Sequence, residues 1–218
     1  TARMPYGPRT TDEVIAYTLQ MANFLVNEKH IKLLVIACNT ATARALSVLQ
    51  DQLSIPVIGV IQPGAKAAQL ATKNKKIGVI ATQGTVTSEA YDVQLHHYNS
   101  QITVVSQAEP EFVQTVELNK YHSDEARKLV NSHLTSLKAA KIDTLILGCT
   151  HFPLLTPFIK SAIGENVTLI DSGQETVQVI QDCLAQSHLS TVSKHDHNDD
   201  VYYTTGDPVL FKAIATDW

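Results

Sequence analysis

The chain has 218 residues, of which 44% are hydrophobic and 17% are charged, and its formal net charge is -4. A charged fraction below the usual ~25% is typical of a compact globular protein and excludes a disordered or fibrous one. Without a basic excess, general binding to nucleic acid or to an anionic membrane is not expected. The longest apolar runs, at Leu33–Ala37 and Thr144–Leu147, are far shorter than the ~20 residues of a membrane-spanning helix, so we expect a soluble protein.

Short β-branched runs alternate along the chain with longer segments in which apolar residues recur every three or four positions. This alternation is typical of α/β units. In chain order it predicts helix 11–29, strand 33–37, helix 41–53, strand 56–61, helix 64–71, strand 76–81, helix 88–98, strand 101–106, helix 124–141, strand 144–148, helix 154–163, strand 167–170, helix 174–186, polar loop 190–200, strand 201–204 and helix 208–217. Such an order favours mostly parallel sheets, in which ligands bind beyond the carboxyl ends of the strands.

The cysteines Cys38, Cys149 and Cys183 are odd in number, widely spaced and without a C-x-x-C pair. This pattern favours neither a disulfide scaffold nor a zinc site, and a reducing, cytoplasmic setting is the default expectation. The stretch His195–His197 lies among other polar residues and is more typical of a solvated loop than of a ligand set. We therefore expect no metal.

Two of the predicted strands end alike, in ACNTATA at Ala37–Ala43 and in GCTHFPLL at Gly148–Leu155. Both Cys38 and Cys149 are thereby predicted to lie near the amino end of a helix, where backbone N–H groups favour a thiolate. A single buried cysteine would be an ordinary structural residue, and Cys183, on an apolar helical face, is interpreted as one. Two cysteines in matched settings favour chemistry instead.

A site with two thiols suits paired acid–base chemistry, in which one thiolate removes a proton from carbon and the other thiol supplies one to the opposite face. Such a pair inverts a stereocentre. No pyridoxal-lysine motif is evident, so a carbanion would be stabilised by hydrogen-bond donors and by exclusion of water. Suitable uncharged donors follow the predicted strands, although helix capping alone would also account for them: Asn39, Thr40, Thr85 and Thr150.

Several motifs together resemble those of the glutamate racemase family, in the same order and along nearly the whole chain. They are MPYGPRT at Met4–Thr10, ACNTATA, IGVIATQGTVTSEAY at Ile77–Tyr91, PEFVQTVE at Pro110–Glu117, GCTHFPLL, and YTTGDP at Tyr203–Pro208. The second cysteine turn of aspartate racemases usually reads GCTE, so His151 favours glutamate over aspartate as the substrate.

The resemblance implies a cofactor-independent enzyme that interconverts L- and D-glutamate and supplies D-glutamate to bacterial peptidoglycan. It implies two similar three-layer α/β domains with the active site between them, and a cytoplasmic homodimer without nucleic-acid or membrane partners. Cys38 and Cys149 match the two catalytic acid–bases, which act on the D- and the L-enantiomer respectively. Glu117 and His151 match assisting groups. The family's substrate-binding positions are matched by Tyr6, Gly7, Asn39, Thr40, Thr85, Thr150 and His151.

The sequence departs from the family pattern at one place. The family begins with a strand and an Asp-Ser-Gly turn that contacts substrate, whereas the same tripeptide at Asp171–Gly173 follows a late predicted strand, so its role is not transferred. We expect the family's first strand and this turn to be absent from the chain. The resemblance further predicts a discontinuous domain A, residues 1–63 plus 172–218, with domain B at 64–171.

Three alternatives stay open on the sequence. The first is an aspartate racemase or another two-thiol racemase, and the second is a hydrolase that uses one cysteine nucleophile. The third is a non-catalytic binding or inhibitory protein built on the same fold. Exchange of a substrate α-proton separates the racemases from the other two.

Overall fold

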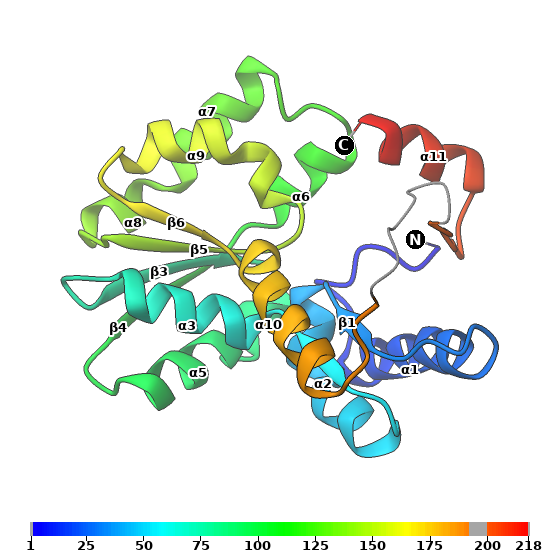
Figure 1. The fold of residues 1–218 in the computed structure, drawn as a ribbon. Helices are drawn as coiled ribbons and strands as arrows, with labels where there is room; N and C mark the ends of the chain where they lie inside the picture. Colours follow the sequence, from blue (N-terminus) through cyan, green and yellow to red (C-terminus); the bar gives the residue numbers. More distant parts are fainter. Residues whose placement is uncertain (1, 192–199, 218) are drawn as a thin grey trace.

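The computed structural model describes residues 2–191 and 200–217. It contains two parallel sheets (Figure 1). A two-stranded sheet pairs β1 (Leu34–Ile36) with β2 (Val57–Gly59). A four-stranded sheet has the order β4-β3-β5-β6, and its strands are β3 (Lys76–Ala81), β4 (Thr103–Ala108), β5 (Thr144–Gly148) and β6 (Thr168–Asp171). The prediction of an α/β protein with parallel sheets is confirmed.

The larger unit, built around the four-stranded sheet, has three layers. One face carries α3 (Ile61–Ala71) and α5 (Ala90–Tyr98), and the other carries α7 (Asp124–His133), α8 (Thr135–Ala139) and α9 (Thr156–Ile163) (Figure 1). Successive residues of a strand face opposite sides of a sheet. Leu145 and Leu147 of β5 accordingly join the apolar cluster under α7 to α9, whereas Ile146 joins the cluster under α3 and α5.

The smaller unit consists of β1 and β2 with α1 (Thr11–Asn27) and α2 (Asn39–Gln52). Its own apolar cluster includes Val14 and Leu49, both without exposed surface. The helix α1 begins at a capping box, in which Thr10 accepts from the N–H of Glu13 and the Glu13 carboxylate accepts from the N–H of Thr10. The two units therefore have separate cores.

The chain after β6 runs back to the smaller unit. The helix α10 (Ser172–Gln186) packs on α3, and the segment behind it reaches α1, where the rings of Phe24 and Tyr203 meet edge to face at 5.2 Å. The last helix is α11 (Pro208–Asp217). No helix in the described parts of the chain is long and apolar enough to cross a membrane. The division into domain A and domain B stays a prediction.

Two sequence predictions about elements are wrong. Helix 124–141 is two helices, α7 and α8, because the carbonyl of His133 accepts a hydrogen bond from the Gln107 side chain at 2.7 Å and so leaves the helical ladder. Residues 201–204 form no strand. Val201 and Tyr202 are exposed, and neither of the two described sheets includes residues 201–204, whereas a strand forms only by pairing within a sheet.

Some elements were not predicted, and others begin elsewhere. The unpredicted ones are α4 (Gln83–Thr87), α6 (Pro110–Glu117) and the 3₁₀ helix η1 (Phe152–Leu155), which precedes α9. The strand predicted at 56–61 is shorter because α3 already begins at Ile61. Most of the predicted loop 190–200, including His195–His197, lies outside the described residues.

Candidate active site

A cavity of about 400 Å³ lies where the larger and the smaller unit meet. The carboxyl ends of β1, β3 and β5 point to it, as expected for parallel α/β sheets. Its lining comes from the loop before α1, the two cysteine turns, the turn after β3 and one face of α6. The lining residues are Met4, Pro5, Tyr6, Gly7, Pro8, Cys38, Asn39, Thr40, Thr82, Gln83, Pro110, Val113, Gln114, Glu117, Cys149, Thr150 and His151.

Cys38 is the N-cap residue of α2 and follows β1. Burial raises the pKa of its thiol, and hydrogen bonds from the N–H groups of Ala41 and Thr40 and from the Thr40 hydroxyl work against that rise. The predicted stabilisation of a thiolate at a helix amino end is therefore present, but desolvation outweighs it. Burial thus favours the neutral form of the Cys38 thiol in the resting protein, while these hydrogen bonds favour the thiolate.

Cys149 lies directly after β5 and is 7% exposed. Burial raises the pKa of its thiol to about 12, against opposing hydrogen bonds from the His151 N–H and from Thr150. Proximity to Cys38 raises it further, because two thiolates repel each other. The charge of one thiol therefore affects the pKa of the other, although the two cysteines follow strands of different sheets.

A histidine and a carboxylate stand behind Cys149. The Nδ1 atom of His151 lies 3.4 Å from Cys149 Sγ, and its Nε2 atom lies 2.5 Å from Glu117 Oε1 at the end of α6. The other ring nitrogen of a neutral imidazole accepts when one donates. With Nε2 donating to Glu117, Nδ1 can accept the proton of the Cys149 thiol.

Opposite Cys149, His151 and Glu117, the cavity wall near Cys38 carries hydroxyl groups. Thr40 Oγ1 lies 2.7 Å from Thr82 Oγ1 and 3.3 Å from Thr85 Oγ1. Burial raises the pKa of the Tyr6 phenol, and Cys38 raises it further, so the phenol stands near that thiol. The backbone of Gly7 packs against Thr82, since a Cβ on Gly7 would lie 3.1 Å from Thr82 Cβ.

A buried network joins the two cysteine turns from behind. Tyr91 donates its hydroxyl proton to Asn39 Oδ1 at 2.6 Å, and Asn39 Nδ2 donates to Ser172 Oγ at 3.4 Å. The Tyr91 ring also contacts the backbone of Gly148, where an added Cβ would lie 3.1 Å from Cε2. Asn39 and Gly148 each adjoin a cysteine, so this network fixes both turns.

Most of the residues singled out in the sequence thus lie together around one cavity. Thr85 is the exception, because it is buried behind Thr40 and does not line the cavity. Cys183 lies on α10, away from it. Within the described chain, no group of three or more His, Cys, Asp or Glu side chains is placed to hold a metal ion.

Sequence reasoning missed several lining residues. Thr82 and Gln83 follow β3 at its carboxyl end, a position that could have indicated them. Val113 and Gln114 lie on α6, whose eight residues are too few to show a helical period clearly. Their place in the wall depends on tertiary packing.

The chain is similar to known proteins over its whole length. A profile of the Asp/Glu/hydantoin racemase family matches residues 1–180. A glutamate racemase of Lactiplantibacillus plantarum is 51% identical over 100% of this chain and 79% of that protein. The crystal structure of glutamate racemase isoform RacE1 from Bacillus anthracis matches with a TM-score of 0.92 and 41% identity, over 100% of this chain and 81% of that one. Glutamate racemase from Francisella tularensis in complex with D-glutamate matches with a TM-score of 0.90 and 30% identity, over 99% and 80% of the two chains. This chain belongs to the Asp/Glu/hydantoin racemase family.

Proposed function

We propose that the protein interconverts L- and D-glutamate and supplies D-glutamate for peptidoglycan synthesis, with Cys38 and Cys149 as the two acid–bases. One observation carries the proposal: two cysteines from different sheets line the same cavity. Full-length relatives at about half identity are glutamate racemases, which favours glutamate over aspartate.

Once the Cys38 thiol has lost its proton to solvent, which burial opposes and the N–H groups at the start of α2 favour, the remaining proton transfers balance without any further reactant. In the D-to-L direction, the Cys38 thiolate takes the α-proton, and the electron pair of the broken C–H bond stays on the substrate as an enolate-like carbanion. The Cys149 thiol then donates its proton to the opposite face of Cα and becomes a thiolate. The reverse turnover restores these protonation states, so the thiol pair carries one negative charge during turnover in either direction.

His151 lowers the cost of charging the buried Cys149 thiol, and Glu117, whose own charge raises the pKa of that thiol, acts through His151. In the L-to-D direction, His151 Nδ1 takes the thiol proton across the 3.4 Å contact, and Glu117 stabilises the resulting imidazolium through Nε2. The Cys149 thiolate then removes the α-proton. On the other side, the N–H groups of Thr40 and Ala41 serve the Cys38 thiolate.

Neutral donors bind the substrate carboxylates and stabilise the carbanion. Suitable groups are the side chains of Asn39, Thr40 and Thr150 and the turn at Tyr6 and Gly7, all of which line the cavity. Thr85 acts from behind by orienting the Thr40 hydroxyl. Donors held in place before the reaction stabilise developing negative charge without the cost of reorganising solvent.

Proton NMR in deuterium oxide tests the proposal. We expect the α-proton signal of L-glutamate, and not that of L-aspartate, to decay with formation of the D-enantiomer. Cys38→Ser and Cys149→Ser should each lower turnover by about a thousandfold or more, because an alcohol is a far weaker acid than a thiol. Cys183→Ser is the matched control and should keep wild-type turnover.

Other outcomes of this experiment assign the alternatives. Decay of the aspartate signal alone would identify an aspartate racemase. Full activity of Cys149→Ser would leave a single-cysteine mechanism. No decay for either amino acid would contradict racemisation and favour a binding protein.

We also propose that the protein works in the cytoplasm as a homodimer. Thiol acid–base chemistry needs reduced cysteines, which a reducing compartment maintains, and none of the three cysteines is in a disulfide. Light scattering coupled to gel filtration should give twice the mass of one chain. A monomeric mass at micromolar concentration would contradict the dimer.

A further inference from the structure

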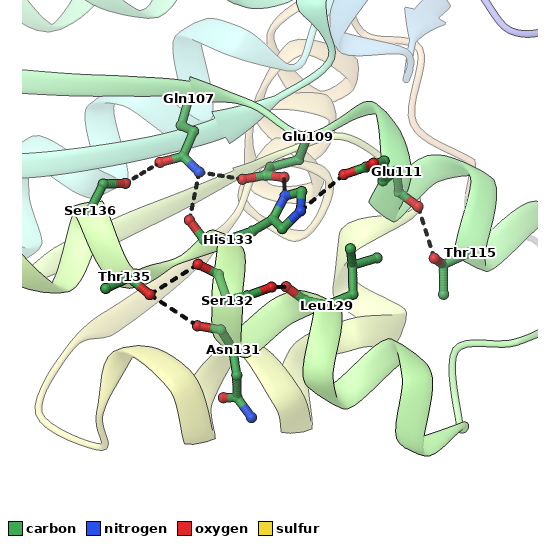
Figure 2. Close-up of polar contacts among 10 residues, drawn as sticks. All are labelled: Gln107, Glu109, Glu111, Thr115, Leu129, Asn131, Ser132, His133, Thr135 and Ser136. Carbon is green, nitrogen blue, oxygen red and sulfur yellow. Dashed lines mark hydrogen bonds and ion pairs between the residues drawn. The ribbon is translucent and has the colours of Figure 1, made fainter.

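A second cluster of charged and polar side chains lies on the larger unit, around His133 at the end of α7 (Figure 2). We define the His133 cluster as His133, Glu109, Glu111, Gln107 and Ser136. Glu109 and Glu111 flank the start of α6, and Gln107 lies on β4. Neither sequence motifs nor the proposed reaction assign this cluster a role.

Both nitrogens of the His133 ring face a carboxylate. Nδ1 lies 2.7 Å from Glu109 Oε2, and Nε2 lies 2.9 Å from Glu111 Oε2. A neutral imidazole carries one N–H, so it can donate to only one of them, whereas an imidazolium donates to both. Of the described side chains, Glu109 and Glu111 form ion pairs with the ring, and the Phe112 ring lies beside it at 5.7 Å between ring centroids.

The carboxylate of Glu109 has no exposed surface. Burial raises its pKa, and the hydrogen bond and charge of His133 oppose that rise. Gln107 Nε2 donates to Glu109 Oε1 at 2.5 Å, and Ser136 donates to Gln107 Oε1 at 2.5 Å, which fixes the amide. A buried carboxylate needs such partners, so the geometry suits the ionised form facing a protonated His133.

The cluster holds the amino end of α6. Glu109 is the N-cap residue of this helix, but its side chain caps no backbone N–H, because the carboxylate points to His133. The start of α6 is therefore positioned by α7 and not by its own cap. The same helix lines the cavity at Val113 and carries Glu117 against His151.

We propose that protonated His133 is a positioning residue, which clamps the start of α6 between Glu109 and Glu111 and thereby places Glu117 against His151. This inference rests on the proposed racemisation. When His133 loses its proton, one carboxylate loses its donor and the start of α6 is held less firmly. Glu117 then supports His151 less well, although no member of the His133 cluster lines the cavity.

The first test compares His133→Gln and Glu109→Gln with the wild type as a function of pH. Glutamine offers N–H groups from one nitrogen only, so it mimics the neutral ring. We expect kcat about tenfold below wild type near pH 5.5, converging to within about twofold near pH 9, with KM changed less than about twofold. All titrating groups other than His133 occur in both the wild type and His133→Gln, so the ratio of their kcat values reports His133, and Glu109→Gln tests its buried partner. A pH-independent ratio would overturn the proposal.

A double-mutant cycle tests whether the effect passes through Glu117. In the Glu117→Gln background, adding His133→Gln should lower kcat by less than about twofold, because the group that it positions is already gone. Independent, multiplicative losses would overturn the proposal. His97→Gln removes an exposed histidine of α5 and should leave kcat unchanged at every pH.

Hydrogen exchange tests the clamp without any assay of glutamate. Amides of segment 110–118 should exchange about fivefold faster in His133→Gln and in Glu109→Gln than in the wild type and in His97→Gln. Equal exchange in all four proteins would overturn the clamp, even if the wild type racemises glutamate. If the two variants exchange faster than the wild type but the wild type does not racemise glutamate, only the proposed function is refuted and the clamp stands.

Discussion

At the scale of single residues, the two thiols differ in what stabilises their charged forms. Cys38 receives N–H groups at the start of α2, which are fixed in the backbone, whereas Cys149 faces His151, a group that can itself take a proton. The charged form of Cys38 is thus stabilised by fixed backbone dipoles, whereas that of Cys149 depends on a side chain that accepts its proton. The positions of both cysteines were predictable from sequence, but the excess of burial over helix-end stabilisation was not.

The raised pKa of Cys149 predicts how stability depends on alkaline pH. Because the folded protein holds this thiol proton more tightly than the unfolded chain does, the stabilisation is complete below about pH 9 and is lost as the pH rises toward 12. The free energy of unfolding in urea should therefore fall over this range more steeply in the wild type than in Cys149→Ser. Cys183→Ser, the control, should follow the wild-type slope, and parallel slopes for all three proteins would contradict the prediction.

At the scale of elements, the sequence predicted strands better than short helices. The β-branched runs identified β1, β3 and β5, and each cysteine turn was placed at the end of a strand. The break between α7 and α8 depends on Gln107, a side chain from another strand, and α6 begins without a side-chain cap. The helix break and the start of α6 both depend on contacts between residues far apart in the sequence. The local sequence pattern therefore could not predict either one. The same holds for the pairing of Glu117 with His151, because the family resemblance marked both as assisting groups but did not predict their contact.

Asp143, just before β5, ties that strand to the turn that follows α3. Its carboxylate accepts hydrogen bonds from the N–H groups of Lys73 and Asn74, both at 2.7 Å, and from the Thr72 hydroxyl at 2.6 Å. Partial burial raises its pKa, but these hydrogen bonds together hold the pKa below the ordinary value. We expect Asp143→Asn to lower the free energy of unfolding by about 1–3 kcal/mol, since an amide cannot accept at both positions.

The depressed pKa of Asp143 also fixes the sign of the pH effect. Its stabilisation is present above the ordinary carboxyl pKa of about 4 and is lost as the pH falls through the lower pKa of the folded state. The difference between wild type and Asp143→Asn should therefore shrink in acid. Asp124→Asn is a control in an exposed ion pair with Arg127, for which we expect less than about 1 kcal/mol. Equal effects of the two variants in urea titrations would contradict the assignment.

At the scale of the whole molecule, the cavity joins two units with separate cores. Ligand contacts with Asn39 and Thr40 on one side and with Thr150 on the other would bind the units together. The motifs predicted that both units contribute to one site, but the two-stranded sheet of the smaller unit and the return of the chain to α1 near Tyr203 were visible only in the fold. These features depend on packing between segments far apart in sequence.

Glutamate should therefore stabilise the molecule as a unit. At about 100 times its dissociation constant, a ligand specific to the folded state adds about 2.7 kcal/mol to the free energy of unfolding. We expect D-glutamate to raise the Tm of a single calorimetric transition, whereas L-lysine, whose side chain has the opposite charge, should not. A ligand-induced shift of only one of two separate transitions would contradict a site shared between the units.

The close approach of Gly84 to Gly7 has a consequence for how the sequence can vary over time. A methyl group at position 84 would lie 2.9 Å from the Gly7 carbonyl oxygen and 3.1 Å from Thr40 Cγ2, a separation at which backbone must shift. Even Gly84→Ala would thus push apart Gly7 and Thr40, which line the cavity from two different segments. We therefore expect position 84 to tolerate no side chain, although the residue has no part in the chemistry, because a side chain there would displace Gly7 or Thr40, which both line the cavity.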